Sequence, residues 1–434
     1  MKNKKKTVIT VICAALAALV LTGAVLLALL PVTYRVDGSL LAKNPDYDAA
    51  LLEDSEFTTL YKENGGAFRI LGFTDLHLDH NKEKGEVTME LMIRNIVREK
   101  PDLVVLVGDN ITSALNRRRA KQLCSVFEEL GVYWTCVLGN HEGDNIWSMS
   151  RQSMVKLFAS YPHCLLDETA KTTADGTKVW GAGNHVVNLA KADGTLIQSL
   201  YFLDGGADMT KADMKKYGLD TSGSSYDCLK ESQIVWYKET VGRIEALAGG
   251  PVRSLVFDHI ALPEMQTAYT ELEAIYPTLA SFDYMKDLAG SDPAATDALV
   301  AEALTHRPLF FDNGGAASPL RGTVLLSGLR RERVCCPDYN SGMFDAILEL
   351  GSTQAFICGH DHVNDFALRY KGVELIYNQV SGYSSYNVVS SKRGAALIQG
   401  GTVYTVGEDG SLSWKSFQNA ALYPEMQEEI KKLY

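Results

Sequence analysis

The sequence predicts an α/β domain built on parallel β-strands and preceded by a membrane-spanning helix. From Phe68 onward, short apolar runs alternate with segments of helical periodicity, which is the pattern of βαβ units. Five short polar clusters each stand at the end of an apolar run, where functional loops gather in sheets of this kind. An uncharged stretch, 8–30, follows the lysines of the N-terminus. These three observations define the prediction.

The N-terminal segment predicts an uncleaved membrane anchor. Residues 8–30 would span about 35 Å as a helix, which is enough to cross a bilayer with some tilt. The lysines among residues 2–6 predict a cytoplasmic N-terminus, with the body of the protein outside the cell membrane. The alternative is secretion after signal cleavage, but Thr22-Gly23-Ala24 is a poor cleavage site followed by more apolar residues. We therefore predict a single-pass protein with an extracytoplasmic domain.

The composition is that of a globular protein. The chain has 434 residues, of which 46% are hydrophobic and 22% charged, with a formal net charge of −11. So acidic a chain is a poor general binder of nucleic acid, and we expect no nucleic-acid partner. If the protein handles phosphate, the positive charge must come locally, from metal ions or a few arginines.

The eight cysteines predict neither a zinc module nor a complete disulfide framework. Cys13 lies in the apolar N-terminal stretch, and the other seven form no C-x-x-C pair. An odd number of cysteines cannot all pair within one chain. Cys136 and Cys358 lie inside apolar runs and are expected to be buried in the core.

Strands and helices alternate along the main part of the chain. Near-continuous apolar runs predict strands at 68–73, 103–107, 132–138, 252–257 and 354–358. Helical spacing predicts helices at 86–100, 116–130, 229–248 and 342–350. Turn signals in 366–417, such as Asp409-Gly410, predict hairpins that form a second sheet. A short helix is expected to close the chain.

The same patterns predict the domain boundaries. The predicted parts are a cytoplasmic tip and anchor (1–34), a linker (35–66), the main domain (67–420) and a C-terminal helix (421–434). Within the main domain, residues 264–333 join two of the polar clusters. We predict that they form an insertion near the active face.

The polar clusters indicate a two-metal site. They read FTDLHLD (73–79), LVGDN (106–110), LGNHE (138–142), VFDHI (256–260) and CGHDH (358–362). A single D-x-H or H-x-H motif often occurs by chance, but five such clusters in succession rarely arise by chance. The candidate ligands that they provide are Asp75, His77, Asp109, Asn140, His259, His360 and His362. Sites of this composition usually cleave phosphate esters.

The ligand types suit the chemistry. Asp109 follows a glycine and could bridge two ions through its two carboxylate oxygens, whereas Asn140 and the histidines are neutral. Two cations held by only two carboxylates leave an excess of positive charge, which binds a phosphoryl group and lowers the pKa of a bridging water. Mixed oxygen and nitrogen ligands favour two divalent or trivalent transition-metal ions, most of all Mn, Fe or Zn, over Ca.

His141 is predicted to be the catalytic residue and not a ligand. Its neighbour Asn140 would point at a metal ion, so the adjacent side chain should diverge and be free to protonate the leaving oxygen. The other histidines, His80, His163, His185 and His306, are expected to be ordinary core or surface residues. The absence of a G-x-S-x-G motif disfavours a serine hydrolase.

Two arginine groups have an open interpretation. They are Arg117, Arg118 and Arg119, and Arg330, Arg331 and Arg333. Both could reach the phosphate of a substrate, but a solvated surface is the favoured interpretation.

Taken in order, D-x-H, G-D, G-N-H-E, a lone His and G-H-x-H resemble the calcineurin-like metallophosphoesterase superfamily over roughly 68–390. Several local stretches look closer to its purple-acid-phosphatase-like branch. They are SQIVWYKE (232–239), HIALPE (259–264), NSGMFDAI (340–347), GHDHVNDF (359–366) and SGYSSY (381–386).

The resemblance implies a four-layer fold, with two packed β-sheets flanked by helices and the site at one edge. It implies that one metal ion binds Asp75, His77, Asp109 and His362, and the other Asp109, Asn140, His259 and His360. His141 would be the acid, and a metal-bridging hydroxide would attack phosphorus in line. Thr112 departs from the pattern, because purple acid phosphatases have a tyrosine ligand there and related protein phosphatases an aspartate that supports the catalytic histidine. This argues against a purple ferric site and against an aspartate-supported His141.

The function predicted from the sequence is therefore that of a dinuclear, metal-dependent phosphohydrolase that acts on a phosphate-ester substrate, with a phosphomonoesterase favoured. Two alternatives stay open. One is a phosphodiesterase or a hydrolase of nucleotides or lipid headgroups. The other is not an enzyme but a membrane-tethered, metal-dependent binding or sensing protein.

Overall fold

A computed structural model describes most of the chain, in the ranges 2–28, 34–41, 47–53, 55–114, 116–144, 146–275, 323–328, 330–385 and 398–433. Its first element is helix α1 (Lys2–Ala28). Within these ranges, no helix is both long enough and apolar enough to cross a membrane. The structure therefore does not support the anchor predicted for residues 8–30, and the location of the protein in the cell stays a prediction.

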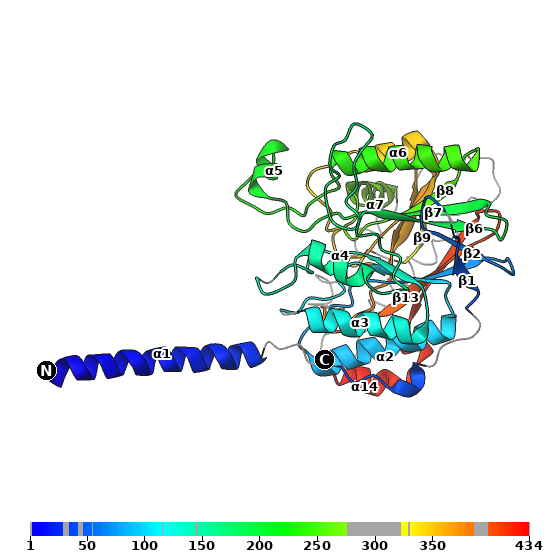
Figure 1. Cartoon of the computed structure of the whole chain (residues 1–434). Coiled ribbons are helices and arrows are strands. Elements are labelled where there is room, and N and C mark those ends of the chain that lie inside the picture. The colour runs from blue at the N-terminus through cyan, green and yellow to red at the C-terminus, as the bar shows by residue number, and fades with distance from the viewer. Residues whose placement is uncertain are drawn as a thin grey trace.

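Two β-sheets form the centre of the molecule (Figure 1). One sheet has nine strands in the order β1-β2-β6-β7-β8-β10-β12-β11-β9, and the other has five in the order β14-β13-β3-β4-β5. The strands of the larger sheet are β1 (Ala49–Leu51), β2 (Thr59–Lys62), β6 (His185–Ala190), β7 (Leu196–Phe202), β8 (Arg253–Phe257), β9 (Val324–Ser327), β10 (Thr353–Cys358), β11 (Ala367–Tyr370) and β12 (Val373–Tyr377). Those of the smaller are β3 (Phe68–Phe73), β4 (Leu103–Val107), β5 (Trp134–Val137), β13 (Gly400–Val406) and β14 (Leu412–Gln418).

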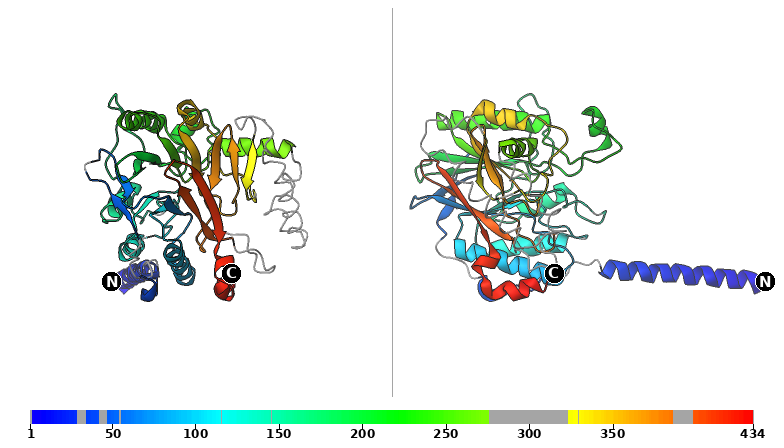
Figure 2. Two further views of the ribbon diagram at one scale, coloured as in Figure 1. Left: turned by 90° about the vertical axis from the view of Figure 1, so that its right-hand side faces the viewer. Right: turned by 180° about the vertical axis from the view of Figure 1, so that it is seen from behind.

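Helices cover the outer face of each sheet, so the layers run helix, sheet, sheet, helix. In Figure 1, α6 lies above the sheets, and α2 and α3 lie below them; Figure 2 shows the same layers from two other sides. The described helices of the domain are η1 (Gly38–Leu40), α2 (Lys82–Glu99), α3 (Arg117–Leu130), α4 (Arg151–Ala159), α5 (Lys211–Lys216), α6 (Glu231–Ala248), α7 (Pro263–Ile275), α12 (Met343–Leu350), α13 (Asn419–Leu422), η2 (Pro424–Met426) and α14 (Gln427–Lys431). This arrangement confirms the predicted fold of two packed sheets with flanking helices.

The burial of β4 shows why apolar runs without alternation form the central strands. Successive side chains of a strand point to opposite faces. Val104 and Leu106 pack with the helices outside the small sheet, whereas Leu103, Val105 and Val107 pack against the other sheet. Both faces are therefore buried, and the strand must be apolar throughout.

The C-terminal hairpins do not form a separate sheet, and that prediction was wrong. Strand β12 pairs in parallel with β10, so the hairpin of β11 and β12 extends the nine-stranded sheet. Strand β13 pairs antiparallel with β3, so the hairpin of β13 and β14 extends the five-stranded sheet. Turn signals reveal a hairpin but not the strand against which it packs.

The lead-in and the predicted insertion also contribute to the core. Strand β2 lies in the segment 35–66 that was predicted to be a linker, and it pairs in parallel with β6. At the two ends of the predicted insertion, α7 buries Met265 and Leu272 against the large sheet, and β9 pairs with β11. Residues 276–322 lie outside the described part of the chain.

A buried histidine links the two sheets. The side chain of His185 on β6 is 1% exposed and stacks on Phe202 with a centroid separation of 4.6 Å. Its Nδ1 donates a hydrogen bond to the carbonyl oxygen of Gly183 (2.7 Å), so Nε2 accepts one from the hydroxyl of Thr135 on β5 (2.6 Å). His185 is thus a core residue, as the sequence predicted. Its burial lowers its pKa to about 4.

We expect His185 to make the protein less stable in mild acid. The unfolded chain protonates a histidine near pH 6.5, whereas the folded chain does so only near pH 4, so the unfolded state binds more protons between these values. The free energy of unfolding should therefore fall by about 2 kcal/mol between pH 7.5 and pH 5 through this residue. Urea denaturation of the wild type and of His185→Gln at both pH values measures this effect. The loss should be about 2 kcal/mol smaller in the variant, and equal losses would refute the assignment.

Candidate metal centre

The five polar clusters meet at one edge of the two sheets. Each follows the carboxyl end of a strand, namely β3, β4 and β5 of the small sheet and β8 and β10 of the large one. Backbone hydrogen bonds join the loops: the amide of Asp75 donates to Gly108 (3.0 Å), and that of Gly359 donates to His259 (3.0 Å). The predicted ligands from five separate segments are thereby brought together.

The backbone at these residues has an uncommon conformation. Asp75, His77, Asp109 and His360 have φ angles of 53°, 45°, 50° and 77°. Left-handed backbone is unfavourable for residues other than glycine and persists where the surroundings enforce it, often at functional sites. Among the other described residues that are not glycine, only Lys100 and Lys371 have a positive φ angle. Lys100 ends α2, and Lys371 lies in the hairpin turn before β12.

The first group of ligand atoms surrounds the space beside Asp75. The Oδ1 atom of Asp75 lies 3.3 Å from Nε2 of His362 and 3.6 Å from Nε2 of His77. Nε2 of His77 lies 3.5 Å from Oδ2 of Asp109 and 3.0 Å from Nε2 of His362. Ligands about 2.0–2.2 Å from one ion lie about 3.0–3.6 Å apart, so these four atoms can bind the same ion.

A second group shares Asp109 with the first. Oδ2 of Asp109 lies 3.2 Å from Nε2 of His259, and the same nitrogen lies 3.2 Å from Oδ1 of Asn140. Ligand atoms of Asp109, His259 and His360 all lie within 4.8 Å of one another. Asp109 therefore belongs to both groups of candidate ligand atoms.

Neighbouring groups turn the ligand atoms toward the centre. Oδ2 of Asp75 accepts a hydrogen bond from the amide of His360 (3.0 Å), and Oδ1 of Asp109 accepts one from the amide of His141 (2.8 Å). Nδ1 of His259 donates to the carbonyl oxygen of Val107 (2.8 Å), which turns Nε2 toward the centre. The remaining oxygens, Asp75 Oδ1 and Asp109 Oδ2, are buried and have no hydrogen-bond partner within the described ranges. Two cations fit this set of residues.

The electrostatics of the site favour positive charge. Burial alone would raise the pKa of Asp75, but the neighbouring rings of His362 and His77 hold it well below its usual range. Burial alone would lower the pKa of His259, but the negative charge of Asp109 raises it to about 10. The two buried carboxylates therefore stay ionised and stabilise a positive charge between them.

Two glycines allow the loops to approach one another closely. A Cβ atom at Gly139 would clash with the carboxylate and the backbone nitrogen of Asp109, and one at Gly108 would clash with the ring of His259. Gly108 also has a φ of 87°. The G-D and G-N-H motifs need glycine before the ligand for this reason.

His141 lies beside the centre without belonging to either ligand group. Its Nε2 is 3.9 Å from Oδ2 of Asp109, and its side chain is 40% exposed. Its Nδ1 donates a hydrogen bond to Oδ2 of Asp144 (2.5 Å). Burial alone would lower the pKa of His141. The negative charges of Asp109 and Asp144 outweigh this effect, so the pKa of His141 lies above its usual value.

Asp144 corrects one expectation from the sequence. Thr112 argued against an aspartate that supports His141, but a carboxylate from a different position makes that contact. Asp144 follows His141 by three residues in the same loop, GNHEGD. The spacing from His141 was the only signal in the sequence, and it does not reveal the loop conformation that joins the two side chains.

A buried network that the sequence did not reveal supports the loops. Glu142 accepts hydrogen bonds from the amides of Asn110 (2.6 Å) and Gly139 (2.8 Å), which joins the second cluster to the third. Arg151 on α4 donates to the carbonyl oxygen of Leu138 (3.2 Å) and forms an ion pair with Asp204. Glu142 belongs to the G-N-H-E motif and could have been found there, whereas Arg151 and Asp204 carry no local signal.

The arginine groups differ from one another. Arg117 and Arg118 are exposed, as predicted, but Arg119 is fully buried. The prediction of a solvated surface was wrong for Arg119 because its guanidinium packs on the ring of Tyr34 at 4.4 Å. In the second group, Arg330 and Arg331 form ion pairs with Glu273 and Asp365, and Arg333 is exposed.

All eight cysteines are free thiols in the structure, and Cys136 and Cys358 are buried, as predicted.

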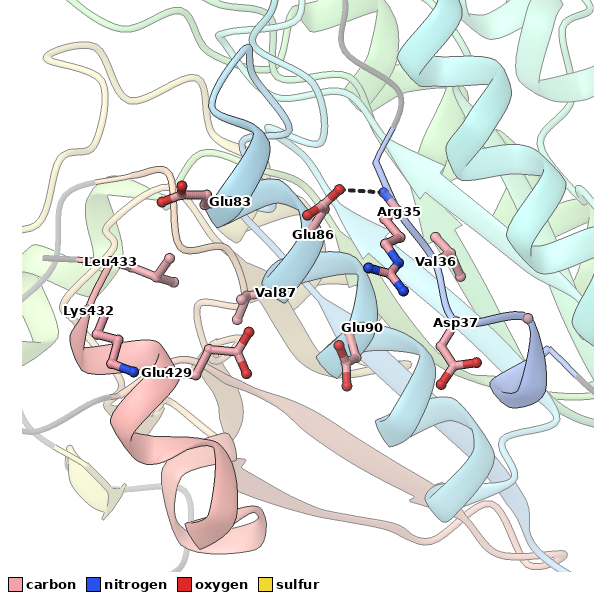
Figure 3. A pocket seen from close by; sticks show the side chains of 11 residues that line it. Arg35, Val36, Asp37, Glu83, Glu86, Val87, Glu90, Glu429, Lys432 and Leu433 are labelled. Carbon is pink, nitrogen blue, oxygen red and sulfur yellow. Dashed lines mark hydrogen bonds between the residues drawn. The ribbon is translucent and has the colours of Figure 1, made fainter.

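A separate pocket of about 650 Å³ lies between α2, α14 and the segment before η1 (Figure 3). Glu83, Glu86 and Glu90 of α2 line it, and the amide of Arg35 donates to Glu86 (2.7 Å). It shares no residue with the ligand groups.

Comparison with known proteins agrees with this geometry. The family model described as calcineurin-like phosphoesterase matches residues 68–364, which include all five clusters. The chain is 27% identical over 364 residues to "Probable inactive purple acid phosphatase 14" of Arabidopsis thaliana, covering 77% of this chain and 75% of that protein. It is 26% identical over 336 residues to "Phosphatase DCR2" of Saccharomyces cerevisiae, covering 73% of this chain and 47% of that protein.

Among solved structures, a dimetal phosphatase from Danio rerio aligns with 81% of this chain and 99% of its own, with a TM-score of 0.39 and 14% identity. The family model alone spans more than half of the chain and includes every candidate ligand. The chain belongs to the calcineurin-like phosphoesterase family.

Proposed function

We propose that this protein is an active, metal-dependent phosphoesterase that prefers phosphate monoesters. The observation that carries the proposal is the pair of ligand groups that share Asp109, with His141 directly beside them. Metal-binding residues alone would also suit a binding protein. A histidine that is held by a carboxylate and faces the centre without serving as a ligand suits proton transfer to a leaving group.

The residues of the candidate site have different roles in this proposal. One cation would be held by Asp75, His77 and His362, and the other by Asn140, His259 and His360. Asp109 would bind both cations. Bound there, two transition-metal ions such as Mn, Fe or Zn would supply Lewis acidity for the phosphoryl group and lower the pKa of a water molecule. His141 donates a proton from Nε2 to the leaving oxygen, and Asp144 orients the ring through Nδ1.

The names of the relatives differ on activity, because one is called a phosphatase and the other a probable inactive one. An active enzyme is supported here by the completeness of the site. The candidate ligand atoms face a common centre, and the histidine and its carboxylate partner are both in place. The extracytoplasmic location is also part of the proposal and depends on the N-terminal sequence alone.

Assays with paired substrates test the proposal. Full-length protein loaded with Mn²⁺ or Zn²⁺ should hydrolyse phenyl phosphate, and a chelator should abolish the activity. We expect kcat/KM for phenyl phosphate to exceed that for diphenyl phosphate about tenfold or more, which is a difference of about 1.4 kcal/mol in the barrier. The reverse preference would favour the phosphodiesterase alternative. Metal-loaded protein that binds phosphate analogues but cleaves no monoester, diester or diphosphate would favour the binding-protein alternative.

A further inference from the structure

One segment of the chain is connected to all three ligands that only the cation of the second group would use. These ligands are Asn140, His259 and His360. The segment, residues 204–227, follows β7 and contains α5, which stands away from the sheets in Figure 1. It supplies no atom to either ligand group. It can therefore act on the second cation only through the way in which it holds the three ligands.

The ring of Tyr226 packs on the ligand His360. The two rings meet edge to face, with a centroid separation of 4.3 Å and an interplanar angle of 88°. The ring of the ligand His259 also lies against His360, at 5.2 Å and 73°. Rings in contact prefer such edge-to-face geometry, so the packing of Tyr226 restricts the orientation of the His360 imidazole.

Gly205 holds the residue that precedes the ligand His259. Oδ1 of Asp258 accepts hydrogen bonds from the amides of Gly205 (3.0 Å) and His259 (2.6 Å). A Cβ atom at position 205 would lie 2.5 Å from that oxygen, so only glycine allows this close approach. The contact fixes the backbone from which the His259 side chain projects.

Asp204 is connected to the third ligand through Arg151. Arg151 forms an ion pair with Asp204. Its guanidinium also donates to the carbonyl oxygens of Leu138 (3.2 Å) and Gly139, and Gly139 directly precedes the ligand Asn140. The loop that carries Asn140 is thereby tied to the same segment.

These three contacts come from one braced unit. The amide of Met209 donates to the carbonyl oxygen of Ser225 (2.9 Å), and that of Asp227 donates to Ala207 (2.7 Å). The two arms of the segment therefore pair in an antiparallel manner. The hydroxyl of Ser225 also accepts a hydrogen bond from the amide of Asp338 (3.1 Å), which ties the unit to the segment after β9.

The loop that carries ligands of the first group is held from another direction. The amides of Ser381 and Gly382, after β12, donate to the carbonyl oxygens of residues 74 (3.0 Å) and 75 (3.2 Å). The hydroxyl of Thr74 also donates to Oδ2 of Asp75 (2.7 Å). The two ligand groups thus have separate supports.

We propose that residues 204–227 set the affinity for the second cation selectively, with Tyr226 and Gly205 as positioning residues. The inference rests on the proposed function for the division of the ligands between two cations. Neighbours that orient metal-binding side chains determine how tightly those side chains bind the ion. Because this segment orients only ligands of the second group, it changes the binding of one ion and leaves that of the other.

Metal titration without substrate tests the inference. Metal-free, full-length protein is titrated calorimetrically with Zn²⁺, which gives an affinity for each of the two ions. We expect Tyr226→Ala to weaken the binding of one ion by about 10–100-fold, the range for lost neighbours of metal ligands, and to leave the other unchanged. Tyr226→Phe keeps the ring and should restore the affinity. Equal weakening of both ions, or no weakening, would overturn the inference.

Three further variants in the same segment sharpen the test. Gly205→Ala crowds the carboxylate of Asp258 and should weaken the same ion. Gly223→Ala is its matched control, because a Cβ atom at position 223 makes only an ordinary contact. Tyr217→Ala is the control for Tyr226→Ala, since it removes a ring that stacks on Tyr339 at 4.0 Å and not on a ligand. Equal losses in the controls would overturn the inference.

Ligand variants identify the ion that is affected. His77→Ala removes a ligand of the first group, whereas His259→Ala removes one of the second group. Adding Tyr226→Ala should weaken the remaining ion in the His77→Ala protein but not in the His259→Ala protein, and the opposite pattern would contradict the assignment. Wild-type protein that binds fewer than two ions would instead refute the two-metal site of the proposed function, so the two failures are distinguishable.

Discussion

Asp109→Asn is expected to cause the largest loss of function. Oδ2 of Asp109 faces both ligand groups, at 3.5 Å from Nε2 of His77 and 3.2 Å from Nε2 of His259. The replacement has nearly the same shape but removes one of two negative charges and the bridging oxygen pair. We expect the metal content to fall from two ions per chain to one or none, and kcat/KM to fall on the order of 10³-fold or more.

A buried aspartate at the other end of the same strand is the control. Asp102 precedes β4, is 7% exposed, and accepts a hydrogen bond from the amide of Arg69 (2.7 Å). Asp102→Asn therefore also removes a buried carboxylate, but one far along the strand from the ligands. It should keep both ions and most of the activity. Full metal content in Asp109→Asn, or equal loss in both variants, would contradict the bridging role.

His141→Ala should separate catalysis from metal binding. The side chain contributes no atom to either ligand group, and its backbone amide, which bonds to Asp109, is kept in alanine. We expect two bound ions and a kcat lower by about 10²–10⁴-fold, the range for a lost general acid. The loss should be smaller for 2,4-dinitrophenyl phosphate than for phenyl phosphate, because a good leaving group needs less protonation. Metal analysis and kcat for both esters measure these effects.

Asp144 and His163 give this prediction its controls. Asp144→Asn keeps the contact with Nδ1 of His141 but removes the charge, so kcat should fall about 10–100-fold with the same dependence on the leaving group. His163 also bonds a carboxylate, with Nδ1 at 2.6 Å from Glu128, but lies away from the centre. His163→Ala should leave kcat unchanged. A loss in His141→Ala that is equal for both esters would refute the role of a proton donor.

The gathering of the candidate ligands could be predicted from the sequence because local patterns mark their positions. Each ligand stands directly after an apolar strand, and a glycine precedes Asp109, Asn140 and His360 in the chain. Strands with both faces buried are nearly all apolar, so their ends are visible in the sequence. The carboxyl ends of parallel strands share one edge of a sheet, which brings such residues together.

The features that the sequence did not reveal depend on contacts between distant segments. The pairing of β13 with β3 places the last hairpin in the small sheet, and no residue of either strand announces it. Arg119 is buried because Tyr34, the last residue of the segment predicted to be the tip and anchor, covers it. Asp144 was missed for a different reason: its spacing from His141 was visible, but the loop conformation that joins their side chains was not.

The central claim is that two metal ions share Asp109 and together support catalysis. Adding Mn²⁺ or Zn²⁺ stepwise to the metal-free, full-length protein, and measuring bound metal and phenyl phosphate hydrolysis in the same samples, tests it most directly. The structure predicts saturation at two ions per chain, with most of the activity gained as the second ion binds. Full activity with one ion per chain, or hydrolysis by the metal-free protein, would contradict the claim.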